Sequence, residues 1–404
     1  MILPHFSFSV PNWLFYCLTF LFGVILGFII LIGYGYFNRD FGHTFLTPLG
    51  LNPQILANKV PSKKPLVGFL PYWTVFEADI HYHLLDYLIY FGVTLQPDGS
   101  IKTQDDHNLE IGYYRLSSGQ MGTIFERAKK QDVKIGIAMI AFDNELIDTL
   151  ISNPQSKNNA IQNMKMLVEQ YDLDTINIDF EYNNGVDINQ KPDVFADFVA
   201  DVKAALVEIN PEIEISVDLY ANAFIHNTAY NVEMLEKVSD QLILMGYDFH
   251  RARSSNAGPV APLKSSMHVS ITKALDSAIQ KEIDPNKIIL AMPLYGYEWS
   301  TVTNQYNSPT YVGSGVMASY KRVQDLIIEH DIQPNWHPEA MSPWIVYERN
   351  GKTQQIYYED DESIGYKLQL IEQANLGGGG FWALGYEGVD ANLWKTVEQW
   401  RRKN

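Results

Sequence analysis

Short apolar segments alternate with helical segments along the chain from Leu66 onward, and this alternation constrains the fold more than any other feature. The apolar segments have the length and the residue types of strands, whereas the segments between them place apolar residues at helical spacing. Strands that alternate with helices form parallel sheets, because each helix returns the chain to the edge where the next strand starts. Eight strand segments are found: LVGFLPYW, Tyr87 to Val93, VKIGIAMIAF, the strand around Asn177, EIEISVDLY, QLILMGYDFH, KIILAMPLYGYEW and GGGGFWALGY.

Eight strand and helix units over roughly 340 residues predict an α/β fold, a single (β/α)₈ TIM barrel. A doubly wound open sheet is the alternative, but the first strand-to-helix turn lacks GxGxxG and no P-loop follows a strand. Between strands seven and eight the connection is long enough to hold a small insertion, from about 300 to 363. We predict a helix there near Ser319 to His330 and a hairpin that turns at Asn350-Gly351.

The N-terminal region differs from the rest. Trp13 to Phe37 contains no charged residue and, at about 1.5 Å per residue, is long enough for a bilayer core of about 30 Å. A cleaved signal peptide is the rival interpretation, but the segment has no Lys or Arg ahead of it and no small-residue cleavage site. We therefore predict a tail over 1–12, a transmembrane helix over 13–37, a linker over 38–65 and the barrel over 66–404. The expected location is a cell membrane, with a single span and the barrel on the extracytoplasmic side, although the charge pattern alone does not set the orientation.

Composition excludes several classes of function. A net charge of −17 and a pI near 5.0 argue against a nucleic-acid partner. The single cysteine, Cys17, leaves no disulfide and no cysteine metal site. His81 and His83 have a spacing that could bind a metal, but no third ligand accompanies them, so no metal and no cofactor is expected. We expect a monomer.

The segment YDLDTINIDFEY contains the most unusual strand. Asn177, Asp179 and Glu181 alternate with three large apolar residues, so a strand would point the polar side chains to one face. A solvated antiparallel strand would show the same alternation. Helical segments flank this strand, however, which indicates a buried parallel strand, and buried carboxylates are tolerated mainly in active sites. Asp179 and Glu181 would lie about 6.6 to 6.8 Å apart along the strand, so that both could reach one ligand.

Active sites of TIM barrels lie where the strands end. Aromatic and acidic residues follow the ends of several predicted strands, and they suit a sugar, whose C–H faces stack on aromatic rings while its hydroxyls form hydrogen bonds. Core packing explains any one of these aromatics, whereas their convergence favours a cleft. The candidates are Tyr72, Trp73, Tyr220, Tyr247, Asp248, Tyr295, Trp299, Trp382 and Tyr386.

Four blocks of sequence carry a resemblance to a known family. The chain from about Leu66 resembles glycoside hydrolase family 18, which contains chitinases and peptidoglycan N-acetylglucosaminidases. Its DxxDxDxE signature matches at Asp174, Asp179 and Glu181, with Asn177 in place of one carboxylate, and the other blocks are MGYD from Met245, MPLYGYEW and Trp382. NIDFE, GPVAPL and YYEDDESIGYK are most similar to the spore-cortex-lytic and cell-wall-associated branch.

The resemblance implies a retaining, substrate-assisted mechanism, in which the 2-acetamido oxygen of the substrate attacks the anomeric carbon. It implies that Glu181 protonates the leaving oxygen, that Asp179 holds the acetamido N–H and that Tyr247 binds the acetamido oxygen. Trp382 would lie under the sugar. The implied substrate contacts also include Asp174, Asn177, Met245, Asp248, Tyr72, Trp73, Tyr295 and Trp299.

The implied function is hydrolysis of a β-1,4-linked glycan that contains N-acetylglucosamine, either peptidoglycan or chitin-like. A weakly active or non-catalytic glycan-binding barrel at the cell surface is the alternative, because barrels of one fold serve unrelated functions. Glu181 favours the enzyme. We expect the amide of Asn177 to donate a hydrogen bond to Asp179 and so to keep Asp179 ionised. His250, Arg251 and Arg253 either contact an acidic group such as a muramyl lactate or belong to a solvated loop.

Overall fold

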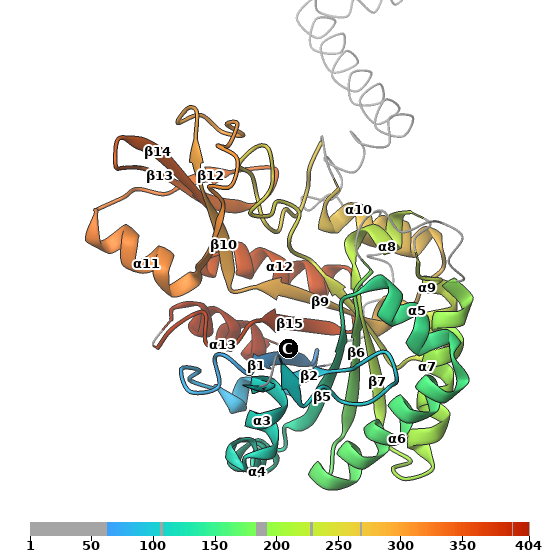
Figure 1. The fold of residues 1–404 in the computed structure, drawn as a ribbon. Coiled ribbons are helices and arrows are strands. Elements are labelled where there is room, and N and C mark those ends of the chain that lie inside the picture. The colour runs from blue at the N-terminus through green and yellow to red at the C-terminus, as the bar shows by residue number, and fades with distance from the viewer. Residues whose placement is uncertain are drawn as a thin grey trace, which may run out of the picture. The chain divides into compact units, whose positions relative to one another are not determined.

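Eight parallel strands close into a barrel in the computed structural model, which describes residues 63–105, 108–182, 192–226, 229–266, 269–389 and 391–403 (Figure 1). The order around the barrel is β1, β2, β5, β6, β7, β8, β9 and β15, so barrel neighbours follow the order of the chain. The predicted (β/α)₈ barrel is thereby confirmed. The strands are β1 Leu66–Pro71, β2 Tyr87–Thr94, β5 Lys134–Ala141, β6 Thr175–Phe180, β7 Glu214–Tyr220, β8 Gln241–Met245, β9 Ile288–Pro293 and β15 Gly378–Trp382.

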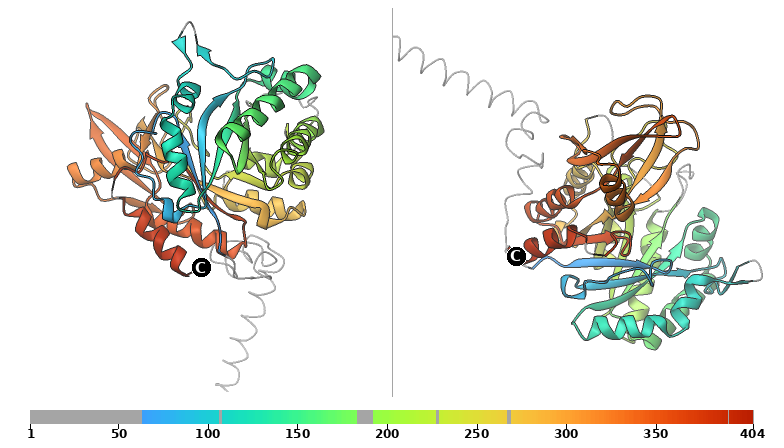
Figure 2. Two further views of the ribbon diagram at one scale, coloured as in Figure 1. Left: turned by 90° about the horizontal axis from the view of Figure 1, so that it is seen from below. Right: turned by 90° about the vertical axis from the view of Figure 1, so that its left-hand side faces the viewer.

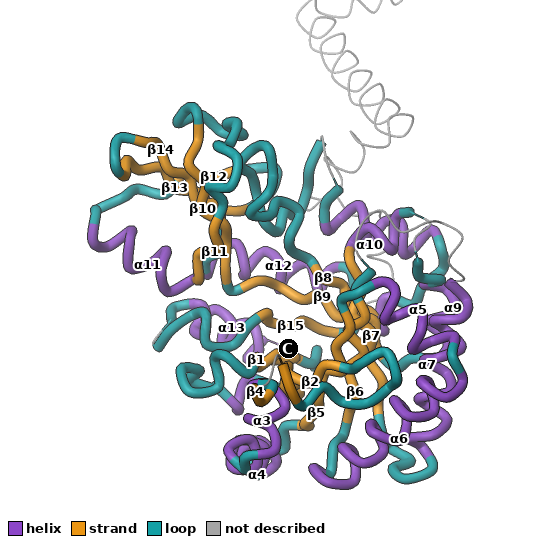
Figure 3. Tube along the Cα trace, in the orientation of Figure 1, coloured by secondary structure: helices purple, strands orange, loops and turns teal. Residues whose placement is uncertain are grey.

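Helices surround the ring of strands on its outside (Figure 3). Local sequence explains where they begin and end. In α6, for example, the Asn153 side chain caps the first turn, Pro154 occupies the first helical position, and Asp172 ends the helix in a left-handed conformation. The helices are α3 Ile111–Ser117, α4 Gln120–Lys129, α5 Asn144–Ser152, α6 Pro154–Tyr171, α7 Pro192–Val207, α8 Ala221–Ile225, α9 Val232–Val238, α10 Ile271–Gln280, α12 Asp361–Gln373 and α13 Leu393–Lys403, with 3-10 turns η2 Tyr82–Leu84 and η3 Pro285–Lys287.

The insertion between β9 and β15 forms a second sheet, which Figure 2 shows apart from the ring of barrel strands. Its antiparallel order is β11, β10, β14, β13 and β12, and the predicted turn joins β13 to β14. Asn350 and Gly351 both have positive φ, as a two-residue hairpin turn requires. Its elements are β10 Tyr295–Thr301, β11 Val316–Ser319, α11 Tyr320–Glu329, β12 Asn335–His337, β13 Ser342–Arg349 and β14 Lys352–Tyr357; a separate hairpin pairs β3 Gln104–Asp105 with β4 Asn108–Leu109.

Strand β6 divides its side chains between two environments. Phe180 packs against Phe195 and Phe198 of α7, with ring centroids 6.0 and 5.5 Å apart. Because side chains alternate along a strand, Asn177 and Asp179 point into the barrel instead. All six residues of β6 are buried, so the polar face is not a solvated one.

The predicted membrane localisation is corrected. Within the part of the chain that the structure describes, no helix combines the length and the apolar character needed to cross a bilayer. The predicted span over residues 13–37 lies outside the described residues.

Candidate active site

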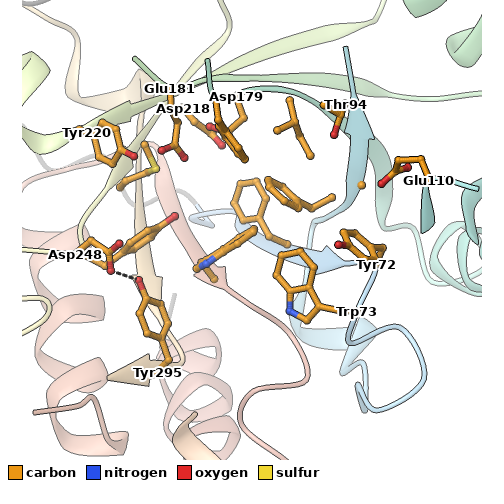
Figure 4. Close-up of a pocket in the computed structure, with 18 residues that line it drawn as sticks. Tyr72, Trp73, Thr94, Glu110, Asp179, Glu181, Asp218, Tyr220, Asp248 and Tyr295 are labelled. Carbon is orange, nitrogen blue, oxygen red and sulfur yellow. Dashed lines mark hydrogen bonds between the residues drawn. The ribbon is translucent and has the colours of Figure 1, made fainter. Parts of the chain in front are cut away.

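A pocket of about 410 Å³ opens at the carboxyl ends of the barrel strands (Figure 4). This volume is within the usual range for a small-molecule site. Asp179, Glu181 and Asp218 gather on one side of the pocket, and Tyr72 and Trp73 lie opposite them. The lining residues are Phe69, Tyr72, Trp73, Phe91, Gly92, Thr94, Glu110, Ile140, Phe142, Asp179, Glu181, Asp218, Tyr220, Met245, Tyr247, Asp248, Tyr295 and Trp382.

The end of β6 is held in place around Glu181. The buried hydroxyl of Tyr230 donates a hydrogen bond to the carbonyl of Phe180 at 2.6 Å and accepts one from the backbone N–H of Tyr182 at 3.0 Å. On the other side, the N–H of Glu181 donates to the carbonyl of Ala141 at the end of β5. The backbone on both sides of Glu181 is therefore fixed, which orients its carboxyl toward the pocket.

Three carboxyl groups face one another, the buried Asp179 and Asp218 and the partly buried Glu181, and they hold protons more tightly than usual. Burial raises the pKa of Glu181 to about 7, and the nearby Asp248 adds to the rise while Arg251 opposes it. Burial, followed by the charges of Glu181 and Asp218, raises the pKa of Asp179 well above its ordinary value. Burial also raises the pKa of Asp218 to about 8. At neutral pH the cluster therefore retains protons, as a general acid requires.

Asn177 has a different partner from the expected one. Its Nδ2 atom donates to the Asp218 carboxylate at 2.7 Å and to the Ser216 hydroxyl at 2.9 Å, both on β7. Both amide protons are thus used on the neighbouring strand, and none is left for Asp179. The expectation that Asn177 keeps Asp179 ionised is wrong, since the pKa of Asp179 is raised by burial and by adjacent carboxyls.

Aromatic rings form one wall and the base of the pocket. The ring of Trp382 lies 4.7 Å from Phe91 and 6.2 Å from Trp73, in edge-to-face arrangements. The Trp73 indole N–H donates to the Tyr386 hydroxyl at 2.9 Å, which fixes the orientation of the indole. Such rigid aromatic surfaces suit the apolar faces of a sugar ring.

A second polar group lies beyond Tyr247. Tyr295 and Tyr297 both donate hydrogen bonds to the carboxylate of Asp248, the latter at 3.2 Å. Arg251 lies 3.5 Å from the same carboxylate, and its guanidinium stacks 5.0 Å from the centre of the Tyr220 ring. Burial, followed by the neighbouring carboxylates, raises the pKa of Tyr247 well above its usual range, so its phenol remains a hydrogen-bond donor.

The structure brings most of the sequence-predicted site residues to this pocket and leaves four outside its lining. One of these, Tyr386, accepts the hydrogen bond from the Trp73 indole. Asp174 lies at the opposite end of β6, where its carboxylate accepts from the N–H of Ile135 at 2.8 Å. Trp299 is fully buried in the insertion sheet beside Tyr357, and Asn177 lies behind Asp179 in the barrel. The residues brought together are Tyr72, Trp73, Asp179, Glu181, Tyr220, Met245, Tyr247, Asp248, Tyr295 and Trp382.

Sequence reasoning missed Asp218, Glu110 and Tyr230. Asp218 could have been found, because it is an acidic residue near the carboxyl end of the strand segment EISVDLY, and site residues of a TIM barrel lie at that end. Glu110 caps α3 through a hydrogen bond from the N–H of Tyr113, so its sequence context indicates only a helix start. No sequence signal indicated that Tyr230, in a loop far along the chain, clamps the end of β6.

The arrangement can perform acid catalysis on a polar, ring-shaped ligand. It offers carboxyls that hold protons at neutral pH, a phenol donor and a rigid aromatic surface around one volume. Among the described residues, no group of three or more His, Cys, Asp or Glu side chains is placed to hold a metal ion.

Comparisons with known proteins agree with this chemistry. The family model described as glycosyl hydrolases family 18 matches residues 66–387. A Bacillus subtilis protein named as a sporulation-specific glycosylase, YdhD, is 26% identical over 245 residues, which are 60% of this chain and 54% of that protein. The chain therefore matches about half of that relative's length.

Two further comparisons are informative. The cortical fragment-lytic enzyme of Bacillus cereus is 21% identical over 312 residues, 74% of this chain and 65% of that protein. Among solved structures, a chitinase from Cycas revoluta in complex with (GlcNAc)3 superposes with a TM-score of 0.70 at 21% identity and covers 83% of this chain and 99% of its own. At that identity the superposition shows a shared fold.

Proposed function

Because the chain belongs to glycosyl hydrolases family 18 and is a glycosidase, we propose that it cleaves β-1,4-linked glycan containing N-acetylglucosamine, with retention of configuration and with assistance from the substrate's own acetamido group. The observation that carries this proposal is the cluster of Asp179, Glu181 and Tyr247 around one pocket. A relative's structure with a bound N-acetylglucosamine oligomer supports the class of substrate.

The first step breaks the glycosidic bond. The acetamido oxygen attacks the anomeric carbon while Glu181 gives its proton to the leaving oxygen, so an oxazolinium ion and a Glu181 carboxylate result. Asp179 accepts a hydrogen bond from the acetamido N–H, and the Tyr247 hydroxyl donates one to the acetamido oxygen. These contacts hold the acetamido group against the anomeric carbon, which lowers the entropic cost of the attack.

The second step restores the enzyme. A water molecule attacks the anomeric carbon from the side that the leaving group vacated, and Glu181 takes a proton from that water. The acetamido oxygen is released, and the new hydroxyl has the configuration of the original bond. Glu181 thus regains the proton that it gave up in the first step. Its pKa of about 7 allows it to act first as an acid and then as a base.

We propose peptidoglycan rather than chitin as the glycan. Arg251 places a half-exposed guanidinium beside two lining residues, Tyr220 and Asp248. A muramic acid residue carries a lactyl carboxylate that could pair with this cation, whereas chitin has none. The relatives from Bacillus are named as a sporulation-specific glycosylase and a cortical fragment-lytic enzyme, not as chitinases.

The first prediction concerns products. The full chain, incubated with purified peptidoglycan or with chitin oligomers, should release fragments that end in N-acetylglucosamine, identified by mass spectrometry. Proton magnetic resonance of fresh products should show the β anomer, and a thiazoline analogue of the sugar should inhibit. Inverted products would contradict the mechanism, and absence of products from both glycans would contradict the function. Faster release from chitin than from peptidoglycan would contradict the choice of glycan.

The second prediction concerns pH. Glu181 must be protonated in the first step, and burial raises its pKa to about 7, so kcat/KM should be highest below this value and fall up to tenfold per pH unit above it. The alkaline limb of the pH profile, the range in which kcat/KM falls, reports the titration of the coupled carboxyls as a group. Initial rates on a labelled oligomer from pH 4 to 9 test this. A flat profile between pH 6 and 9 would exclude a carboxyl with this pKa as the acid.

A further inference from the structure

Asn177 and Asp218 form a buried pair whose geometry the proposed mechanism does not use. Asn177 is fully buried, and its two amide protons go to Asp218 and Ser216. Among the residues that the structure describes, the remaining polar atom of the amide, Oδ1, has no hydrogen-bond partner, and neither does Oδ1 of Asp179. Since an amide oxygen can only accept, Asn177 presents an acceptor, not a donor, on the face of β6 that it shares with Asp179.

The pair also accounts for the departure from the family signature. That signature has a carboxylate where this chain has Asn177, and here a carboxylate lies 2.7 Å away on the adjacent strand. Ser216 is the direct partner of Asn177 in the β6–β7 register, and Asp218 follows it on the same inward face. The carboxyl that is missing from β6 is therefore present on β7.

We propose that Asp218 is a positioning residue that acts with Asn177, orienting its amide and giving the cluster of Asp179 and Glu181 the ionisable carboxyl that the signature places at position 177. This proposal rests on the proposed function. It assigns two separable tasks to Asp218, because an amide at 218 could still accept the hydrogen bond from Asn177 but would carry no charge.

The groups that face Asp218 determine how this charge acts. Asp179 faces it from β6, Glu181 from just after β6, Tyr247 from beyond β8 and Tyr230 from the loop after α8. Asp248 and Arg251 act on Glu181, the first raising and the second lowering its pKa. When Asp218 loses its proton, its negative charge raises the pKa of Asp179, so the cluster releases its remaining protons only at higher pH.

The test exchanges the charge between strands. In Asp218→Asn, the alkaline limb of kcat should move to lower pH by roughly one unit, because one negative charge is lost. In Asn177→Asp, which adds a charge, the limb should move to higher pH by a similar amount. The double variant has one carboxyl in the pair again, on β6, and its limb should return to near the wild-type position.

Ser216→Ala provides the matched control. It removes the other partner of the Asn177 amide without changing any charge, so it should lower kcat less than tenfold and leave the limb where it is. A wild-type pH profile in Asp218→Asn would overturn the proposal. So would a double variant whose limb stays with that of Asn177→Asp.

Thermal unfolding as a function of pH gives a readout that needs no activity. The pKa of Asp218 rises from an ordinary value near 3.8 to about 8 in the fold, so the folded state binds more protons in this window and loses stability as pH rises through it. Asp218→Asn should remove this loss, and its Tm relative to wild type should increase from pH 4 to pH 8. Asn177→Asp should do the opposite.

The two readouts separate the possible failures. If the wild type is inactive but the variants show the expected Tm trends, the proposed function is wrong, whereas the coupling of Asp218 to Asp179 and Glu181 is supported. An active wild type whose variants show pH-independent Tm differences would overturn the role of Asp218. If Asp218→Asn does not fold, the Asn177→Asp profile still decides, because its limb must move to higher pH.

Discussion

The Glu181→Gln enzyme is expected to hydrolyse glycan about 10² to 10⁴ times more slowly than wild type while it binds the glycan as tightly. The amide keeps the size of the carboxyl and its place in the pocket but has no proton to give to the leaving oxygen. The loss should appear in kcat, and the dissociation constant for a chitin or peptidoglycan oligomer, measured by calorimetry, should change little.

A substrate with an activated leaving group sharpens this test. A 4-nitrophenyl glycoside needs little protonation as it departs, so Glu181→Gln should recover much of its first-step rate on such a substrate. If Glu181→Gln kept most of the wild-type rate on natural glycan, Glu181 could not be the acid.

Glu387→Gln is the matched control for this substitution. Glu387 is also buried, burial raises its pKa to about 7, and its carboxylate accepts from the N–H of Gly385 at 2.8 Å. It does not line the pocket. Its replacement should leave kcat within a few-fold of wild type, which separates a raised pKa as such from a catalytic position.

The Asp179→Asn enzyme is expected to lose about 10² to 10³ in kcat, the range found when a polar group that stabilises a transition state is removed. The Asp179 carboxyl accepts the acetamido N–H and, when it is ionised, opposes the positive charge that develops on the oxazolinium ion, whereas the amide of Asn can never carry a charge. Because the loss concerns the attack of the acetamido group, an activated leaving group should not restore the rate. Initial rates on natural and 4-nitrophenyl substrates measure both effects.

Asp360→Asn is the control for this second variant. Burial raises the pKa of Asp360 too, and its carboxylate caps α12 by accepting from the N–H of Ser363 at 2.8 Å. Asparagine caps helices about as well, so the fold should be kept. Equal losses in Asp360→Asn and Asp179→Asn would show that the effect is structural. Recovery of Asp179→Asn on the activated substrate would assign it to departure of the leaving group instead.

Local patterns in the sequence were sufficient for the barrel. A strand with one apolar face, such as β6, can be predicted from a few consecutive residues. The same holds for a helix with capping residues at its start, such as α6. The turn at Asn350-Gly351 was predictable for the same reason, since these residue types adopt positive φ at low cost. The position of the site was predictable once the barrel was recognised. Parallel strands end at one edge of the barrel, and this brings Tyr72, Asp179 and Trp382 together.

Sequence patterns failed where distance in the chain hides proximity in space. The sequence predicted Trp299 at the carboxyl end of the seventh barrel strand, because MPLYGYEW has the pattern of one continuous strand. In the fold β9 ends at Pro293, and a new strand, β10, carries Trp299 into the insertion sheet. Tyr230 lies about 50 residues after Phe180 in sequence, and its hydrogen bonds to the end of β6 have no local signature.

The sequence by itself determined the eight strands, the polar face of β6 and the acidic and aromatic residues at the strand ends, because each depends on side-chain periodicity or backbone preference over a short stretch. Only the tertiary structure decided the protonation of the site. A pKa depends on burial and on charges from every neighbouring element, and the partner of Asn177 proved to be Asp218, 41 residues away on β7. The carboxyl that this chain lacks at position 177 of β6 is replaced by Asp218 of β7, which only the pairing of the two strands brings beside Asn177.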